Sequence, residues 1–221
     1  MFKRRLTTSD IFLILVNGVP LYGVWFENWD ARMVFLVYCL ETIIIGIINV
    51  LKMAAVTILV KPTDYWNNNG VSNKASGWFF ILFFILHYGI FVFVQTQLFF
   101  SVSGLIKGHS LFSGYAQIPA LLGNEGKLLL AIFITYYTLQ TLFSFFQSGE
   151  YKTISMARLM FQPYTRIIVQ QLAVILGSIF LGFGAGKIFI LIFALIKIGI
   201  EVYIRPDRFL DKMQEANSAK K

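Results

Sequence analysis

Long apolar runs recur along the whole chain, and they restrict its fold more than any other feature. Each is about as long as an α-helix must be to cross roughly 30 Å of hydrocarbon. Six such runs lie at residues 10–26, 31–60, 77–102, 127–147, 164–183 and 188–204. A helix satisfies its own backbone hydrogen bonds, as a bilayer interior requires. The sequence therefore predicts an all-α polytopic membrane protein, a bundle of six transmembrane helices.

The composition supports this class. Of 221 residues, 57% are hydrophobic and 14% are charged, whereas a soluble domain has about 25% charged residues. The mean hydropathy is +0.70. The net charge of +8 does not indicate nucleic-acid binding, because the basic residues lie mostly in loops and tails. The expected partner is the lipid bilayer; a homo-oligomer or other membrane-protein partners stay open.

The distribution of Lys and Arg predicts the orientation. With the N-terminus inside, 13 of the 19 basic residues fall in cytoplasmic segments and 4 in external loops, as the positive-inside rule requires. Both termini are therefore expected in the cytoplasm. Residues 1–221 form a single transmembrane domain in this interpretation, with a polar tail at 205–221. Whether the glycine-rich loop 103–126 re-enters the membrane is left open.

Polar side chains interrupt the apolar runs, although a charge at the bilayer centre costs about 2.5–3.5 kcal/mol on insertion scales. Such residues usually face the bundle interior. The candidate interior polar site consists of Glu41, Asn49, Lys52, His87, Gln95, Gln170, Lys197 and Glu201.

Helical geometry predicts how these residues are arranged. Glu41 and Lys52 are eleven positions apart, so they share a helical face but are separated by roughly 16 Å of rise. Each therefore needs a partner from another helix, and Glu41 is expected to be buried beside one. Glu201 is the preferred counter-ion of Lys52, with His87 as the alternative. The predicted inner layer holds Lys52, His87, Gln170, Gln171, Lys197 and Glu201, and the outer layer holds Glu41, Gln95, Gln97 and Tyr137.

Known catalytic and cofactor patterns do not fit. A rhomboid protease needs a G-x-S-G serine at a helix start, and the nearest string, residues 101–104, ends a helix. Two histidines and one cysteine, widely spaced, give no metal-ligand motif. We therefore expect no cofactor, no metal and no catalytic residue, and an enzyme is not the favoured class.

Several motifs together resemble a family of uncharacterised prokaryotic multi-pass membrane proteins, a domain of unknown function. They are N-x-V-P-L-x-G-V from Asn17, E-x-x-I-I-G-x-x-N-x-x-K-M from Glu41, H-Y-G-x-F from His87, P-Y-x-R-I from Pro163 and K-x-x-x-E from Lys197. The resemblance implies a prokaryotic inner (plasma) membrane and no transferable activity. It also implies that other members have histidines near Gln95 or Gln97 and Gln170 or Gln171, and an aspartate at Glu201. Glutamine is a poor metal ligand, so this departure disfavours a metal site.

Three classes of function remain from the sequence. In the first, the interior polar site binds or passes a small polar solute or protons. In the second, the chain is a structural or accessory subunit whose buried polar groups specify helix packing. Such groups often form hydrogen bonds that hold membrane helices together. The third, an intramembrane metal or redox protein, ranks last for want of ligands.

Overall fold

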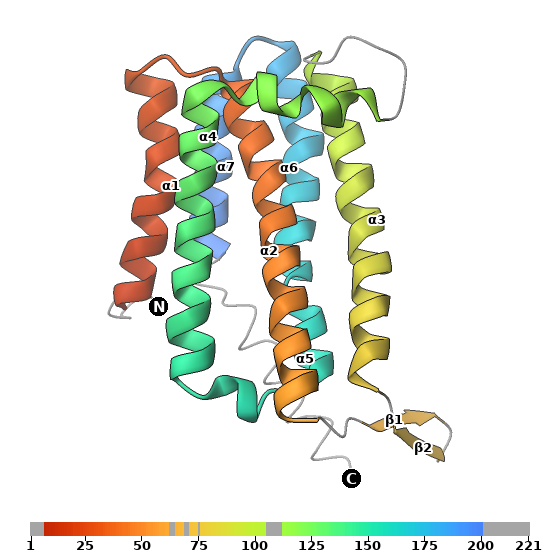
Figure 1. Cartoon of the computed structure of the whole chain (residues 1–221). Coiled ribbons are helices and arrows are strands. Elements are labelled where there is room, and N and C mark those ends of the chain that lie inside the picture. The colour runs from red at the N-terminus through yellow and green to blue at the C-terminus, as the bar shows by residue number, and fades with distance from the viewer. Residues whose placement is uncertain (1–6, 62–64, 69–70, 75, 105–111, 201–221) are drawn as a thin grey trace, which may run out of the picture.

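The computed structural model describes residues 7–61, 65–68, 71–74, 76–104 and 112–200. Over these residues the chain is an all-α bundle, with one short β-hairpin at its lower end (Figure 1). "Upper" here means the end at which α2 and α7 begin. The elements are α1 (Thr8–Phe26), α2 (Ala31–Leu59), β1 (Tyr65–Asn68), β2 (Val71–Lys74), α3 (Gly77–Ser103), α4 (Ser113–Thr141), a π-helical turn (Leu142–Gln147), a 3-10 turn (Glu150–Lys152), α5 (Met156–Phe161), α6 (Tyr164–Gly182) and α7 (Gly186–Gly199).

Side-chain caps define where several helices begin. Thr7 and Asp10 form a reciprocal capping box at α1. Asp30 accepts a hydrogen bond from the Arg32 backbone N–H at α2, and Ser76 accepts one from Trp78 at α3. Each cap satisfies a backbone N–H that has no partner within the helix, which contributes about 1 kcal/mol. These polar residues thus fix the ends of the apolar helices.

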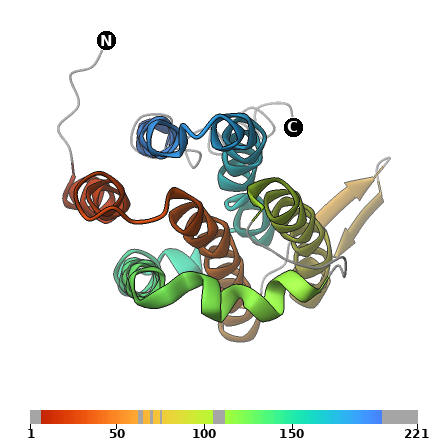
Figure 2. The same ribbon diagram turned by 90° about the horizontal axis from the view of Figure 1, so that it is seen from above.

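Helix α2 is the central element of the bundle. Figure 2 shows it surrounded by α1, α3, α4, α6 and α7. All ten residues from Met33 to Thr42 are buried, on every side of the helix. Below them only a stripe at Gly46, Asn49, Met53 and Val56 is buried. Residues buried on every side of a helix indicate that other helices surround it. The upper half of α2 is therefore shielded from lipid.

The loop predicted at 103–126 is partly helical, which corrects the sequence interpretation. Helix α4 already begins at Ser113, and its first turns lie across the upper end of the bundle before the chain turns downward (Figure 1). Gly123 makes the turn with φ 57° and ψ −162°, a conformation that is essentially confined to glycine. Tyr115 on this upper arm stacks on Phe93. The predicted fourth span, 127–147, corresponds to the descending part of α4 and its π-helical turn.

A short helix that the sequence interpretation did not include precedes the fifth apolar run. Helix α6 matches the predicted span 164–183 closely, but the short helix α5 lies below it (Figure 1). Met156, Leu159 and Met160 of α5 are buried. Because α5 occupies the lower end, α6 starts higher than a span beginning at Tyr164 was expected to start.

The outer faces of the helices are strongly apolar. Three helices are long and apolar enough to cross a membrane: Ala31–Leu59, Gly77–Ser101 and Ser113–Gln147. Large hydrophobic side chains are exposed along α1 and α3, including Phe12, Leu15, Phe79, Leu82 and Ile90. An exposed apolar surface of this extent is typical of a face that contacts lipid or another protein. The fold is therefore that of a helical membrane protein.

Candidate functional site

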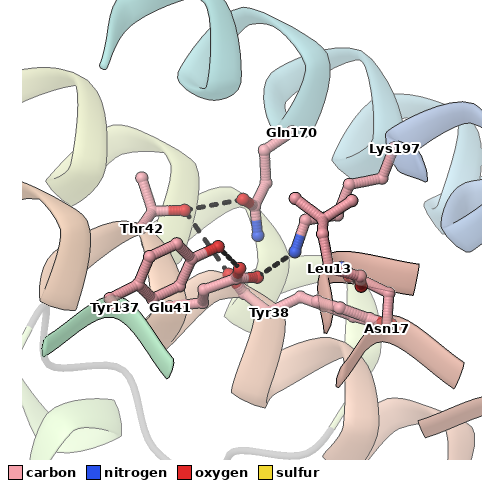
Figure 3. Close-up of polar contacts among 8 residues, drawn as sticks. All are labelled: Leu13, Asn17, Tyr38, Glu41, Thr42, Tyr137, Gln170 and Lys197. Atoms are coloured by element: carbon pink, nitrogen blue, oxygen red, sulfur yellow. Dashed lines mark hydrogen bonds and ion pairs between the residues drawn. The ribbon is translucent and has the colours of Figure 1, made fainter. Parts of the chain in front are cut away.

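A buried ion pair joins α2, α4 and α7 in the interior. The Lys197 ammonium donates a hydrogen bond to Glu41 Oε2, and the Tyr137 hydroxyl donates one to Glu41 Oε1 (Figure 3). Glu41 is 1% exposed and Lys197 is 6% exposed. Glu41 thus lies buried in the bundle with a polar and a cationic partner, Tyr137 and Lys197, from other helices.

The register of two helices explains why Glu41 and Lys197 meet. Helices α2 and α7 both run downward from the upper end (Figure 1). Glu41 is ten positions after the first residue of α2, and Lys197 is eleven after the first residue of α7. At 1.5 Å per residue both lie about 15–17 Å below the upper end. The prediction that Lys197 belongs to an inner layer separate from Glu41 is therefore wrong.

Two aromatic rings enclose the ammonium group. Lys197 Nζ lies 4.7 Å from the centroid of the Tyr38 ring and 5.1 Å from that of Phe133. The negative face of an aromatic ring attracts a cation, and more strongly where water is excluded. The charge on Lys197 is thus stabilised both by the Glu41 carboxylate and by the two rings.

A neutral hydrogen-bond group adjoins the ion pair. Thr42 Oγ1 donates to Gln170 Oε1 at 2.6 Å, and the Tyr88 hydroxyl donates to the Thr42 backbone carbonyl at 2.8 Å. Gln170 was predicted in the inner layer, but it lies beside Thr42, next to Glu41, because α5 lifts the start of α6. The Gln170 amide nitrogen points toward the ion pair in Figure 3 and has no hydrogen-bond partner among the described residues.

Two more buried amides have an unpaired oxygen. Gln95 is 1% exposed, and its Oε1 has no partner in the described part of the chain. The side chains of Gln95 and Gln170 both lie close to the Cys39 thiol. Asn17, also 1% exposed, donates to the Leu13 carbonyl at 2.9 Å, while its Oδ1 is unpaired among these residues. The interior thus offers unused donors and acceptors near Glu41.

Asn49 and Lys52 lie lower on α2 and do not contact the ion pair. Asn49 Nδ2 donates to the Leu159 carbonyl at 2.9 Å and so ties α5 to α2. Lys52 Nζ lies 5.0 Å from the centroid of the Phe145 ring. Its preferred counter-ion, Glu201, lies outside the described residues, so that pairing stays a prediction.

His87 does not belong to the interior, which is a further correction. Its side chain is exposed on α3, and Nδ1 is 2.6 Å from the Tyr164 hydroxyl. Its ring stacks on Phe83 with centroids 5.3 Å apart. The sequence pattern could not distinguish this outward-facing histidine from an inward-facing one.

The sequence interpretation missed Thr42, Asn17 and Tyr38 as parts of this site. Thr42 follows Glu41 directly, and Asn17 is a lone amide in the first apolar run, so both carried a weak signal. Tyr38 carried no such signal, because an aromatic residue in an apolar run is most often part of the hydrophobic core. Among the described residues, no group of three or more His, Cys, Asp or Glu side chains could hold a metal ion.

These features define a helical membrane protein with an ion pair, a tyrosine and several amides buried in its interior. The chain belongs to a family of unknown function, DUF6498, whose model matches residues 1–221. This confirms the resemblance found in the sequence. No curated protein and no solved structure matches the chain.

Proposed function

We propose that this protein passes protons, or a small polar solute together with them, through the interior site built on Glu41, Tyr137 and Lys197. One observation carries the proposal: a carboxylate and an ammonium group are both almost fully buried where apolar packing was available. Replacing a buried ion pair by apolar residues of similar volume is often neutral or even stabilising. Ionisable groups inside membrane helices usually mark a pathway for ions or protons.

The geometry suits proton exchange. Glu41 accepts hydrogen bonds from two groups that can themselves lose a proton, Lys197 and Tyr137. Transfer of a proton from the Lys197 ammonium to the Glu41 carboxylate would turn the charged pair into a neutral one. Since charge burial is costly, the neutral and charged states differ in how they pack and hydrate. A proton that binds Glu41 would remove its negative charge and so break the ion pair with Lys197. We propose that this change between the charged and the neutral state accompanies each proton transfer.

Proton flux tests the proposal directly. The purified full-length protein is reconstituted in liposomes that contain a pH-sensitive dye, and flux is measured after a pH jump. We expect wild-type flux above that of empty liposomes and a loss of about ten-fold or more in Glu41→Gln, as for one essential proton carrier. Lys187→Met, which changes an exposed lysine at the start of α7, is the matched control. Wild-type flux equal to that of empty liposomes, or full flux in folded Glu41→Gln, would refute the proposal.

A structural or accessory role is the second candidate, and one observation favours it. The rings of Tyr38 and Phe133 flank the Lys197 ammonium closely, so the pair is held in a well-packed environment. If the pair only specifies helix packing, the double variant Glu41→Leu/Lys197→Leu should fold and should retain any measured activity. Loss of flux in a folded double variant would exclude this role.

We also propose six membrane spans with both termini in the cytoplasm of a prokaryotic inner membrane. The distribution of Lys and Arg supports this orientation, as does the position of the start of α1 and the end of α7 toward the same side of the bundle (Figure 1). A reporter fused after residue 221 should be cytoplasmic, and one inserted at residues 105–111 should be external. The opposite pattern would reverse the proposed topology.

A further inference from the structure

We infer that Cys39, Gln95 and Gln170 form a second binding subsite, for a small neutral molecule that both donates and accepts hydrogen bonds. Water is the smallest molecule of this class, and a simple amide is a larger one. This subsite adjoins the ion pair on the side of α3. We regard it as the entry to Glu41, and in this respect the inference rests on the proposed function.

Unused hydrogen-bonding groups carry the inference. The Gln170 amide nitrogen is a donor and Gln95 Oε1 an acceptor, and neither has a partner among the described residues. Both side chains are at least nine-tenths buried. Both contact the Cys39 thiol, so they face one small region between α2, α3 and α6. Buried groups of this kind are usually satisfied by an internal water or a ligand.

The chemistry of the lining selects a neutral molecule. The thiol and the two amides are uncharged, and the nearby charges of Glu41 and Lys197 neutralise each other. An ion that entered would lose its hydration without gaining a counter-charge, which is costly in a medium of low dielectric constant. A neutral molecule with a donor and an acceptor would satisfy both amides at once.

Polar residues of α3 continue from this subsite toward the upper end. Thr96 and Gln97 follow Gln95, and both are hydrogen-bond partners of Tyr115 on the upper arm of α4. Tyr115 is also close enough to Cys39 for an electrostatic interaction. Tyr115 therefore covers the polar route where it reaches the upper end, and Gly123 is the bend at which the arm joins the descending helix.

The lower side of the site is closed by an apolar cluster. Its buried members are Met53, Val56, Phe80, Ile81, Phe84, Tyr88, Phe145, Met156, Leu159, Met160 and Ile167. A polar molecule would have to displace these close-packed side chains to leave downward. Polar groups therefore lie between the subsite and the upper end, whereas the side chains packed below it are mostly apolar.

Cys39 reports on this subsite because it is the only cysteine in the chain. The full-length protein in lipid nanodiscs is treated with methyl methanethiosulfonate, which is small and neutral, or with its trimethylammonium-ethyl and sulfonatoethyl counterparts. In each case the thiol loses its proton, a mixed disulfide forms and methanesulfinate leaves; intact mass measures the rate. We expect the neutral reagent to react at least about ten-fold faster than either charged one, as the cost of burying charge requires.

Variants at the two ends of the bundle test the route. Tyr115→Ala should accelerate the neutral reaction, and Tyr115→Phe, which keeps the ring but loses the hydroxyl, should accelerate it about five-fold or less. Tyr164→Ala removes a tyrosine at the start of α6, away from the upper arm of α4, and is the matched control. Gln95→Leu should slow the reaction, because it makes the lining apolar. Cys39→Ser gives the blank.

Three outcomes would overturn the inference: equal rates for neutral and charged reagents, no reaction of folded wild-type protein, or equal effects of Tyr115→Ala and Tyr164→Ala. These measurements do not involve proton flux. If Cys39 reacts as expected while Glu41→Gln retains full flux, the subsite stands and the proposed function fails. If flux depends on Glu41 while Cys39 does not react, the proposed function stands and the subsite fails.

Discussion

Lys197 on α7 and Glu41 on α2, separated by 156 positions in the sequence, form an ion pair at the same depth in the bundle. The pair joins the last described helix to the central one, and Tyr137 adds α4 to the same carboxylate. Three helices are thereby held together by one buried acid. Because Glu41 is deeply buried and binds side chains of two other helices, the stability of the protein should depend on the charges of Glu41 and Lys197.

The ion pair should show strong energetic coupling. Glu41→Gln or Lys197→Met alone strands the other charge and should lower the free energy of unfolding by roughly 3–5 kcal/mol. The double variant should be more stable than the sum of the two losses predicts. Denaturant unfolding in detergent measures all four proteins. Strict additivity of the two losses would show that the side chains are not coupled.

The hydroxyl of Tyr137 should matter much more than that of an exposed tyrosine. Tyr137→Phe removes a hydrogen bond to a buried carboxylate, and such bonds contribute about 1.5–3 kcal/mol. Tyr22→Phe removes an exposed hydroxyl that contacts Glu27 at 3.3 Å, and should change stability by less than about 0.5 kcal/mol. Thermal unfolding of both variants in the same detergent compares them. Equal effects would contradict the assigned role of Tyr137.

Gly46 should not tolerate a side chain. A Cβ at this position would lie 2.5 Å from Cε1 of the buried Tyr88 ring, whose hydroxyl is held by the Thr42 carbonyl. Gly46→Ala should therefore destabilise the protein by about 1–3 kcal/mol. Gly89→Ala on α3 is the control, because nothing lies within 4 Å of its Cβ position and alanine favours helix. A higher melting temperature for Gly46→Ala than for wild type would refute the close contact.

Asp30 should make stability depend on pH at the start of α2. Partial burial acts to raise the pKa of Asp30, but hydrogen bonds from Arg32 outweigh it, and the net pKa lies below the usual value. A lowered pKa in the folded state contributes stability above the unfolded pKa, near 3.8, and this is lost as pH falls through the folded pKa. Asp30→Asn keeps the cap but removes the charge. The stability difference between wild type and Asp30→Asn should shrink between pH 6 and pH 3; a constant difference would contradict the assignment.

Lys52 and Glu201 remain a predicted pair. Lys52→Met should lower folded yield or thermal stability in detergent, and adding Glu201→Gln should recover part of the loss, because removing both partners leaves no stranded charge. Strict additivity would exclude the pairing. If neither single variant changes stability, Lys52 reaches the interface with its long side chain.

The sequence determined the class of this protein and the identity of its most buried charge. Apolar runs of bilayer length predicted a helical membrane protein, because a helix satisfies its backbone hydrogen bonds within one segment, as lipid requires. The charge of Glu41 inside such a run predicted a buried acid with a partner from another helix. Both conclusions rest on local features and needed no knowledge of packing.

Only the tertiary structure decided which residues meet. Glu41 contacts Tyr137 of its own predicted layer, but it also pairs with Lys197, which was predicted in the other layer. The depth of each side chain depends on where its helix starts. Helix α5 raises α6 and brings Gln170 to Thr42, and His87 turns outward to Tyr164. Helical periodicity specifies the face of a residue relative to its own helix. It does not specify how helices are shifted and rotated against one another, and that relative placement created the site.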